Sequence, residues 1–235
     1  MQNNSLKQNN LGLTLMLDSS SAPLTAVLFS DGKIYSAAKD GIKQEELLFP
    51  LLKKLYKKAG KNFKDTQNFF FIKGPGRFTG IRIGVTLASV LAEINDTNIA
   101  SADIFKVLEP AVLNSPGFKK WQSKNPDGKI VIILPAFREE YFVSMQGEDM
   151  PKWLNIEDLN KVLSAQKEPL FLAGWAGAKE PLKKYFGKNY TYSKVNFLTS
   201  EILFEAAKKY LGSQTKEEVL TPLYLKPARF ELCGK

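Results

Sequence analysis

The chain has 235 residues, of which 44% are hydrophobic and 24% charged, as expected for a soluble globular protein with one large domain or two small ones. It contains no histidine, which excludes a Ser-His-Asp triad, a Cys-His dyad and an H-E-x-x-H zinc site. The formal charge of +9 favours an anionic partner such as tRNA or an acidic protein surface; for any single lysine cluster, the alternative of a solvated surface is the favoured one.

Residues 1–10 are polar and form no apolar segment, so we expect a disordered lead-in rather than a signal peptide. The single cysteine excludes an intrachain disulfide and, without histidine, a structural zinc site. No clustered acidic loop is visible to hold a hard metal ion, so no metal is expected. No apolar run reaches the roughly 20 residues that cross a bilayer. Together these features predict a cytoplasmic protein that does not associate with membranes.

The first hundred residues predict a β-β-β-α-β-α series. Apolar strand-forming runs alternate with turn residues such as Asp31-Gly32, and a leucine stripe at helical spacing ends at Gly60. Thr79 is predicted to be the N-cap of the second helix. The predicted elements are strands 11–17, 24–29, 33–37 and 69–73 and helices 44–59 and 79–93.

A second α/β series follows a Pro-, Gly- and Lys-rich stretch, 114–129, which is predicted to be a loop between the halves. Thr199 or Ser200 is expected to cap the last helix. The sequence thus predicts an N-terminal lobe at 11–110, a C-terminal lobe at 111–200, and a helix and tail at 201–235 that pack back on the N-terminal lobe. The predicted elements here are strands 130–134, 140–146 and 170–173 and helices 156–165, 179–186 and 200–211.

Both N-terminal helices carry more apolar residues than one buried stripe needs. Helix 44–59 has five leucines within nine residues, and helix 79–93 is apolar on nearly every side. Gly84 and Ala88, one turn apart, would let another helix come close. We therefore expect a partner chain to cover these helices, the alternative being that each is a central core helix. The candidate interface residues are Leu47, Leu48, Leu51, Leu55, Ile83, Leu87, Val90 and Leu91.

The segment Phe69–Gly84 predicts a strand, a glycine turn and a helix, a geometry that presents backbone N–H groups and a helix dipole to an anion. It lacks the Gly-Lys-Ser/Thr ending of a Walker A loop and the third glycine of a dinucleotide fingerprint. The favoured alternative is a tight packing joint. The candidate nucleotide- or anion-binding residues are Asp18, Ser19, Ser20, Gly76, Arg77, Thr79 and Arg82.

Asp18 follows the first strand and begins a run of three serines. In sugar-kinase and actin-like folds an acidic residue at this place meets Mg²⁺ and nucleotide phosphates. The alternative, which we favour, is a serine-rich turn in which Asp18 accepts hydrogen bonds from backbone N–H groups. Arg82 is expected to form an internal ion pair, with Asp18 as its candidate partner, or to reach an anion.

Four lysines of helix 44–59 form a basic cluster that could contact a tRNA backbone. The alternative is a solvated helix face, because few aromatic residues interleave with them to stack on bases. The candidate tRNA-contacting residues are Lys53, Lys54, Lys57 and Lys58.

The segment Gly74–Gly84, Gly-Pro-Gly-Arg-Phe-Thr-Gly-Ile-Arg-Ile-Gly, resembles the Gly-Pro-Gly-Ser-Phe-Thr-Gly-Leu-Arg-Ile-Gly signature of the TsaB/YeaZ family. These are bacterial tRNA threonylcarbamoyladenosine biosynthesis proteins and relatives of the glycoprotease family. The resemblance extends along most of the chain through weaker motifs in the same order. They lie at Leu17–Ser21, Glu46–Pro50, Ala136–Phe142, Ala173–Gly177 and Leu220–Pro227.

The resemblance implies an actin-like ATPase (ASKHA, ribonuclease H-like) fold of two α/β lobes whose mixed sheets are flanked by helices. It implies no catalysis by this chain and no resident cofactor, although ATP or ADP could lie at the joint with TsaD. The family pairs with the catalytic paralogue TsaD through the N-terminal-lobe helices, and TsaE joins the complex. The complex transfers threonylcarbamoyl from its adenylate to N6 of adenosine 37 in tRNA, and a homodimer is expected when TsaD is absent.

The chain departs from the family pattern at Arg77, where serine is usual, at Lys43-Gln44, at Glu139 and at Trp175-Ala176. The last two put nucleotide binding by the second lobe in doubt. The rival interpretation is an enzyme of the same superfamily, either a small-molecule kinase or a glycopeptidase, which tight MgATP binding by the isolated chain would favour. A free-standing RNA-binding module rests on net charge alone, and salt-sensitive binding of tRNA to this chain would favour it.

Overall fold

The computed structural model describes residues 11–41, 43–174, 190–194 (backbone only) and 198–226. The chain divides into two compact units. The first contains the chain up to Ile104 together with Leu198–Leu223, and the second contains Phe105–Phe197 and continues from Tyr224. The segment after residue 197 therefore returns to the first unit before the chain re-enters the second.

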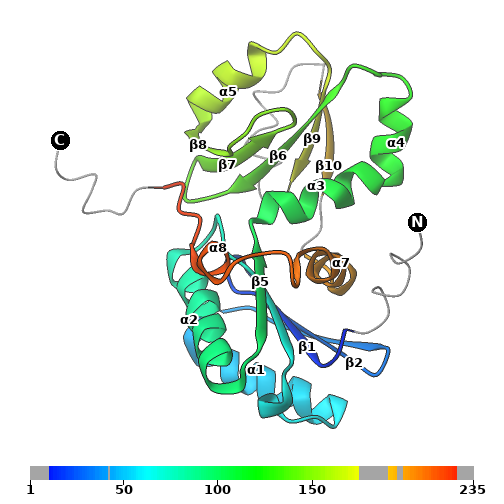
Figure 1. The fold of residues 1–235 in the computed structure, drawn as a ribbon. Coiled ribbons are helices and arrows are strands. Elements are labelled where there is room, and N and C mark those ends of the chain that lie inside the picture. The colour runs from blue at the N-terminus through cyan, green and yellow to red at the C-terminus, as the bar shows by residue number, and fades with distance from the viewer. Residues whose placement is uncertain (1–10, 42, 175–189, 195–197, 227–235) are drawn as a thin grey trace, which may run out of the picture. The chain divides into compact units, whose positions relative to one another are not determined.

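The first unit is built on a five-stranded mixed sheet with the order β3-β2-β1-β4-β5 (Figure 1). The strands β1, β2 and β3 form an antiparallel meander, whereas β1, β4 and β5 are parallel. The strand bounds are β1 (Thr14–Asp18), β2 (Leu24–Ser30), β3 (Lys33–Lys39), β4 (Asn68–Ile72) and β5 (Asn98–Ala102).

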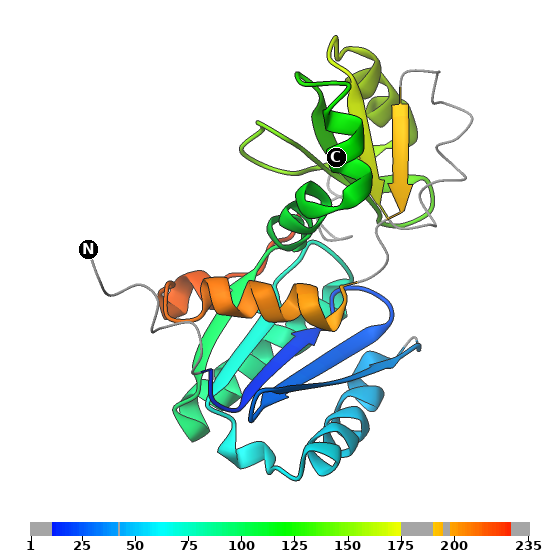
Figure 2. The ribbon, with the colours of Figure 1, turned by 90° about the vertical axis from the view of Figure 1, so that its right-hand side faces the viewer.

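Helices cover both faces of this sheet (Figures 1 and 2). The longest, α1 (Gln44–Ala59) and α2 (Phe78–Asn95), cover one face, and α7 (Ser200–Tyr210) crosses the other. Alternate strand residues such as Leu15 and Phe71 pack with α1 and α2 in one apolar core. On the α7 side the rings of Phe29 and Phe204 lie 4.8 Å apart. The remaining helices are the short η1 (Phe63–Asp65) and α8 (Lys216–Leu220).

The second unit repeats the topology of the first. Its mixed sheet has the order β10-β9-β6-β7-β8, in which β6, β7 and β8 are antiparallel and β6, β9 and β10 are parallel. Leu159 and Leu163 of α5 are buried in its core, and the Phe118 ring of α4 meets Phe171 edge-on at 5.2 Å. The elements are α3 (Ile104–Asn114), α4 (Pro116–Gln122), β6 (Lys129–Pro135), β7 (Glu140–Met145), β8 (Lys152–Asn155), α5 (Ile156–Ser164), β9 (Leu170–Gly174) and β10 (Tyr190–Lys194).

Two mixed sheets of the same strand order, each flanked by helices, confirm the predicted α/β class. Helix 44–59 and the Thr199 cap of α7 are confirmed. Thr79 as an N-cap is wrong, because α2 begins at Phe78 and Thr79 lies inside its first turn. The predicted loop 114–129 contains α4. The predicted lead-in at 1–10 and the helix at 179–186 lie outside the described residues. Within the described residues, no helix combines the length and apolarity that crossing a membrane requires.

Candidate functional site

The glycine turn before α2 is a tight joint with the loop that follows β1. The Ser19 hydroxyl donates to the Gly80 carbonyl at 2.7 Å, and the Arg77 backbone N–H donates to the Ser20 carbonyl at 2.7 Å. A Cβ on Gly80 would lie 1.7 Å from the Ser19 carbonyl oxygen, and one on Gly76 would lie 2.2 Å from that of Ser20. Both glycines are therefore required by close backbone approach, as the packing-joint alternative predicts.

Asp18 is enclosed by the serines that follow it. Its side chain is 1% exposed, and its Oδ1 accepts hydrogen bonds from the backbone N–H of Ser20 at 2.9 Å and from the Ser20 hydroxyl at 2.8 Å. Oδ2 accepts from the Ser21 hydroxyl. Burial raises the pKa of Asp18 above its usual value, against the opposing effect of these hydrogen bonds. The serine-rich turn expected from the sequence is confirmed.

The expected ion pair between Arg82 and Asp18 is wrong. The guanidinium of Arg82 lies 4.0 Å from the centre of the Phe78 ring on the exposed side of α2, whereas Asp18 is directed into its own loop. A stacked guanidinium retains its hydration on the exposed side, so this arrangement avoids burying a charge.

The raised pKa of Asp18 predicts a pH dependence of stability. The folded state favours the protonated carboxyl, so this contribution is complete below the ordinary pKa of 3.8 and is lost as the pH rises through the higher pKa of the folded state. Asp18→Asn replaces the carboxyl group with an amide that does not ionise, so the variant does not lose this stability as the pH rises. We expect the free energy of unfolding of the variant, minus that of the wild type, to increase from pH 4 to pH 7 in urea titrations.

Asp31→Asn is the matched control, because the exposed Asp31 has its pKa lowered by hydrogen bonds from Lys61 and Ser30. Such a group stabilises the fold above its ordinary pKa of 3.8, so the difference for this variant should decrease as the pH rises toward 3.8 and stay nearly flat from pH 4 to pH 7. A flat or decreasing difference for Asp18→Asn would show that the serine hydrogen bonds outweigh burial.

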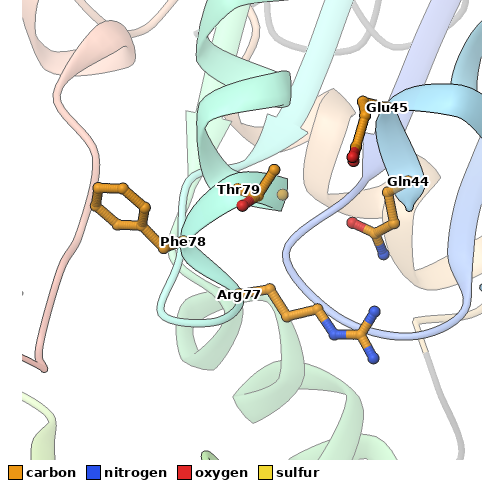
Figure 3. A pocket seen from close by; sticks show the side chains of 6 residues that line it. Gln44, Glu45, Arg77, Phe78 and Thr79 are labelled. Atoms are coloured by element: carbon orange, nitrogen blue, oxygen red, sulfur yellow. The ribbon is translucent and has the colours of Figure 1, made fainter. Parts of the chain in front are cut away.

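A hollow of about 340 Å³ lies between the first turns of α1 and α2 (Figure 3). Gln44 and Glu45 of α1 face Thr79 of α2 and its N-cap residue Arg77 across it. The buried Gln44 donates from Nε2 to the Ser21 carbonyl at 2.6 Å, and Arg77 donates to the Gly41 carbonyl at 3.3 Å. The helix N-termini and Arg77 favour an anion here, whereas the Glu45 carboxylate opposes one. Nucleotide or anion binding thus stays a prediction.

Five of the eight candidate interface residues are core residues. The expectation that a partner chain covers them is therefore wrong. They are at most 8% exposed, so in this fold they present no surface to a partner. Gly84 also faces inward, because a Cβ there would lie 2.8 Å from the Phe71 ring. This glycine lets α2 pack closely on the sheet of the same unit rather than on another helix. The buried positions are Leu48, Leu51, Leu55, Leu87 and Leu91.

Two exposed apolar residues of α2 lie along its outer face, defined here as Thr79, Arg82, Thr86, Val90 and Ile94. Val90 is 43% and Ile94 75% exposed, and the other candidates Leu47 and Ile83 are half-buried.

Phe49 of α1, 63% exposed, and Ile94 were missed by the sequence analysis. The small residues Gly80, Gly84 and Ala88 recur one turn apart along α2. This spacing could have indicated which side of α2 packs on the sheet and therefore which side is exposed.

The lysine cluster of α1 is solvent-exposed throughout, so both of its interpretations remain open. Lys53, Lys54, Lys57 and Lys58 lie on the side of α1 away from the leucines that pack on the sheet. Among the described residues, no three acidic or cysteine side chains gather in a way that could hold a metal ion.

Comparison with known proteins identifies relatives of the chain. A family model described as TsaD, tRNA N6-adenosine threonylcarbamoyltransferase, matches residues 42–101, which include α1, β4 and α2. The tRNA threonylcarbamoyladenosine biosynthesis protein TsaB of Buchnera aphidicola subsp. Schizaphis graminum is 27% identical over 113 residues, 48% of this chain and 51% of the relative. The chain thus aligns with about half the length of that relative.

The fold extends the similarity along most of the chain. YeaZ from Pseudomonas aeruginosa superposes with a TM-score of 0.64 at 18% identity, covering 92% of this chain and 100% of that one. A Pseudomonas aeruginosa protein described as similar to peptidase YeaZ gives a TM-score of 0.68 at 19% identity with the same coverage. At such identities the superpositions establish the fold alone. The chain is thus similar in part of its sequence to TsaB and to the TsaD family, and along most of its length it shares the fold of YeaZ.

Proposed function

We propose that this chain is a non-catalytic subunit of the complex that forms N6-threonylcarbamoyladenosine at position 37 of tRNA. In this proposal it pairs with TsaD, and TsaE joins the pair while threonylcarbamoyl passes from its adenylate to the adenosine. The curated TsaB relative and the TsaD family model support a role in this biosynthesis. The sequence supports the non-catalytic role, because a chain without histidine cannot supply a histidine-based site.

The observation that carries the pairing is the outer face of α2. Val90 and Ile94 lie one turn apart and hold apolar surface in solvent, within the segment that the TsaD family model matches. Burying a valine or isoleucine side chain contributes roughly 1.5–3 kcal/mol before the costs of association. Thr86, one turn before Val90, is small and uncharged, so a facing helix can approach there without burying an unpaired charge.

A second copy of the chain would use the same face when TsaD is absent. Such a pair would bring two outer faces of α2 together, with Arg82 and Glu93 flanking the apolar positions on each helix. We propose that TsaD and the second copy compete for this one surface, since one helix face cannot contact both.

Reconstitution tests the function. Purified TsaD, TsaE, tRNA and threonylcarbamoyl-adenylate are combined with and without this chain, and modified adenosine is measured by mass spectrometry of the digested tRNA. We expect modification to require this chain together with TsaD, and no product from this chain alone. Product formed by this chain without TsaD would refute the non-catalytic role, and undiminished product without this chain would refute the proposed function.

A further inference from the structure

The C-terminal half of α1 carries an exposed basic surface. Buried and exposed pairs of residues alternate here, because Leu51-Leu52 and Leu55-Tyr56 pack in the core of the first unit and the lysine pairs that follow each of them are exposed. At about 100° per residue, the four lysines fall within about 140° of the helix circumference. They form one surface, called here the α1 lysine patch: Lys53, Lys54, Lys57 and Lys58.

The patch has no acidic neighbour to neutralise it. The residues three and four positions before and after each of its lysines include no aspartate or glutamate, and none of the four ammonium groups forms an ion pair with a described residue. Lysines of α5 and α7 do pair with an acid one turn earlier: these pairs are Lys161–Asp158 at 3.1 Å and Lys208–Glu205 at 3.0 Å. Like charges four residues apart disfavour a helix, so α1 carries the patch at a cost to its own stability.

The helix dipole accounts for only half of the patch. Cations stabilise the last turn of a helix, and Lys57 and Lys58 belong to that turn of α1. The effect fades beyond the last turn, so it gives no reason for Lys53 and Lys54. From Lys53 to Lys58 the helix rises by about 7.5 Å, which is within the screening length of about 8 Å in physiological salt. The four charges therefore act together on a polyanion.

The composition of the patch fits a phosphate backbone better than a protein or a membrane. Lysine binds phosphate as a point charge, whereas it is depleted at protein–protein interfaces. An amphipathic helix binds a membrane through its apolar side, but the leucine side of α1 is buried in the core of the first unit. The patch contains no arginine to read base edges and no aromatic ring to stack on bases, so its contacts would not depend on nucleotide sequence.

We propose that the α1 lysine patch binds the phosphate backbone of RNA and that this RNA is the tRNA substrate of the complex, the second part of which rests on the proposed function. Each ammonium group would neutralise one phosphate and release the counterions condensed there. Such contacts hold and orient a nucleic acid without reading its sequence. The patch shares no residue with the outer face of α2, so this inference concerns a different surface from the proposed contact with TsaD.

Salt-dependent binding of tRNA to the full chain tests the patch. Fluorescence anisotropy measures the Kd of a labelled, unmodified tRNA transcript between about 50 and 200 mM KCl, the range over which backbone contacts weaken steeply. The patch variant is Lys53→Gln/Lys54→Gln/Lys57→Gln/Lys58→Gln, in which glutamine removes each charge and still favours a helix. We expect its Kd at about 100 mM KCl to rise at least about tenfold. The slope of log affinity against log salt should become shallower by about 3, since each phosphate contact contributes about 0.7 to 0.9.

A matched variant separates the patch from net charge. It replaces four other exposed lysines by glutamine, lowers the charge by the same amount and should keep the wild-type slope, and circular dichroism verifies that both variants fold. An equal loss of affinity in the two variants, a wild-type slope in the patch variant, or no binding of tRNA to the wild type would overturn the proposal. Binding of poly-L-glutamate through the patch without binding of tRNA would identify an acidic protein surface instead. The four control lysines are Lys33, Lys120, Lys124 and Lys167.

The patch and the proposed function can fail separately, because reconstitution with the wild-type chain uses no patch variant. Binding of tRNA through the patch by a chain that is dispensable for modification would refute the proposed function and leave an RNA contact. A chain that is required for modification, and whose patch variant binds tRNA as the wild type does, would refute this inference alone.

Discussion

Gly80→Ala is expected to lower the free energy of unfolding by at least about 3 kcal/mol, a large part of the stability of an ordinary domain. The new methyl group would lie 1.7 Å from the Ser19 carbonyl oxygen and 2.8 Å from Gln44 Oε1. The nearest obstacle is backbone, which cannot rotate away as a flexible side chain can. The loop after β1 and the first turn of α2 would have to separate, breaking the hydrogen bond from Ser19 to Gly80. Urea denaturation followed by circular dichroism measures the loss.

Gly117→Ala is the matched control. Gly117 lies in the first turn of α4, and nothing lies within 4 Å of a Cβ built on it. Alanine should stabilise this variant by up to about 1 kcal/mol, because glycine is the poorer helix former. If Gly80→Ala were as stable as Gly117→Ala, the loop joint would be looser than the packing argument requires.

The double variant Val90→Asp/Ile94→Asp is expected to weaken binding to TsaD by at least about 100-fold while leaving this chain folded. Burying an unpaired carboxylate at an interface costs several kcal/mol, and about 2.7 kcal/mol corresponds to a factor of 100 in Kd. Both residues are exposed in the isolated chain, so its stability should change by only about 0.5 kcal/mol. Isothermal titration calorimetry measures the affinity, and circular dichroism checks the fold.

Met150→Asp serves as the control for this pair, since Met150 is 61% exposed and belongs to the second unit. It adds one negative charge, against two in the double variant, at an exposed apolar position outside α2, and we expect wild-type affinity. An equal loss of affinity from both variants would point to net charge rather than to the outer face of α2. Undiminished binding by the double variant would remove that face from the interface.

The sequence predicted the elements whose signals are local. Helix α1 was located at its observed bounds because a leucine stripe fixes its buried side and Gly60 ends it in the left-handed conformation, with φ 66°. The Thr199 cap of α7 was equally clear. Signals for two missed helices were also present: the Ser115-Pro116 start of α4, and the capping box of Thr215 with Glu218 at α8.

The sequence could not decide which side of an apolar helix meets its own sheet. Leu51 and Leu87 were candidates for a partner interface, yet they are 8% and 7% exposed, because the sheet of the same unit already covers them. Val90 and Ile94 remain exposed because they lie on the opposite side of α2. The row of small residues Gly80, Gly84 and Ala88 marks a closely packed side of α2, but only a tertiary contact such as that of Gly84 with Phe71 shows that the neighbour is the sheet of the same unit and not another helix.

The partner of Arg82 could not be predicted for a related reason. Sequence alone offered Asp18 as an acidic partner, but that carboxylate is buried in its own loop and accepts three hydrogen bonds there, two from Ser20 and one from Ser21. Phe78, four residues before Arg82 on α2, provides a ring face at the surface instead. The partner of a charged side chain thus depends on which other groups remain exposed to solvent after folding.

Hydrogen–deuterium exchange of this chain with and without saturating TsaD tests the central claim most directly, because it locates the contact surface without any substitution. The account predicts that TsaD slows exchange in peptides covering α2, Phe78–Asn95, while the β7–β8 region of the second unit exchanges at an unchanged rate. Binding of TsaD with protection confined to the second unit, and none in α2, would contradict it.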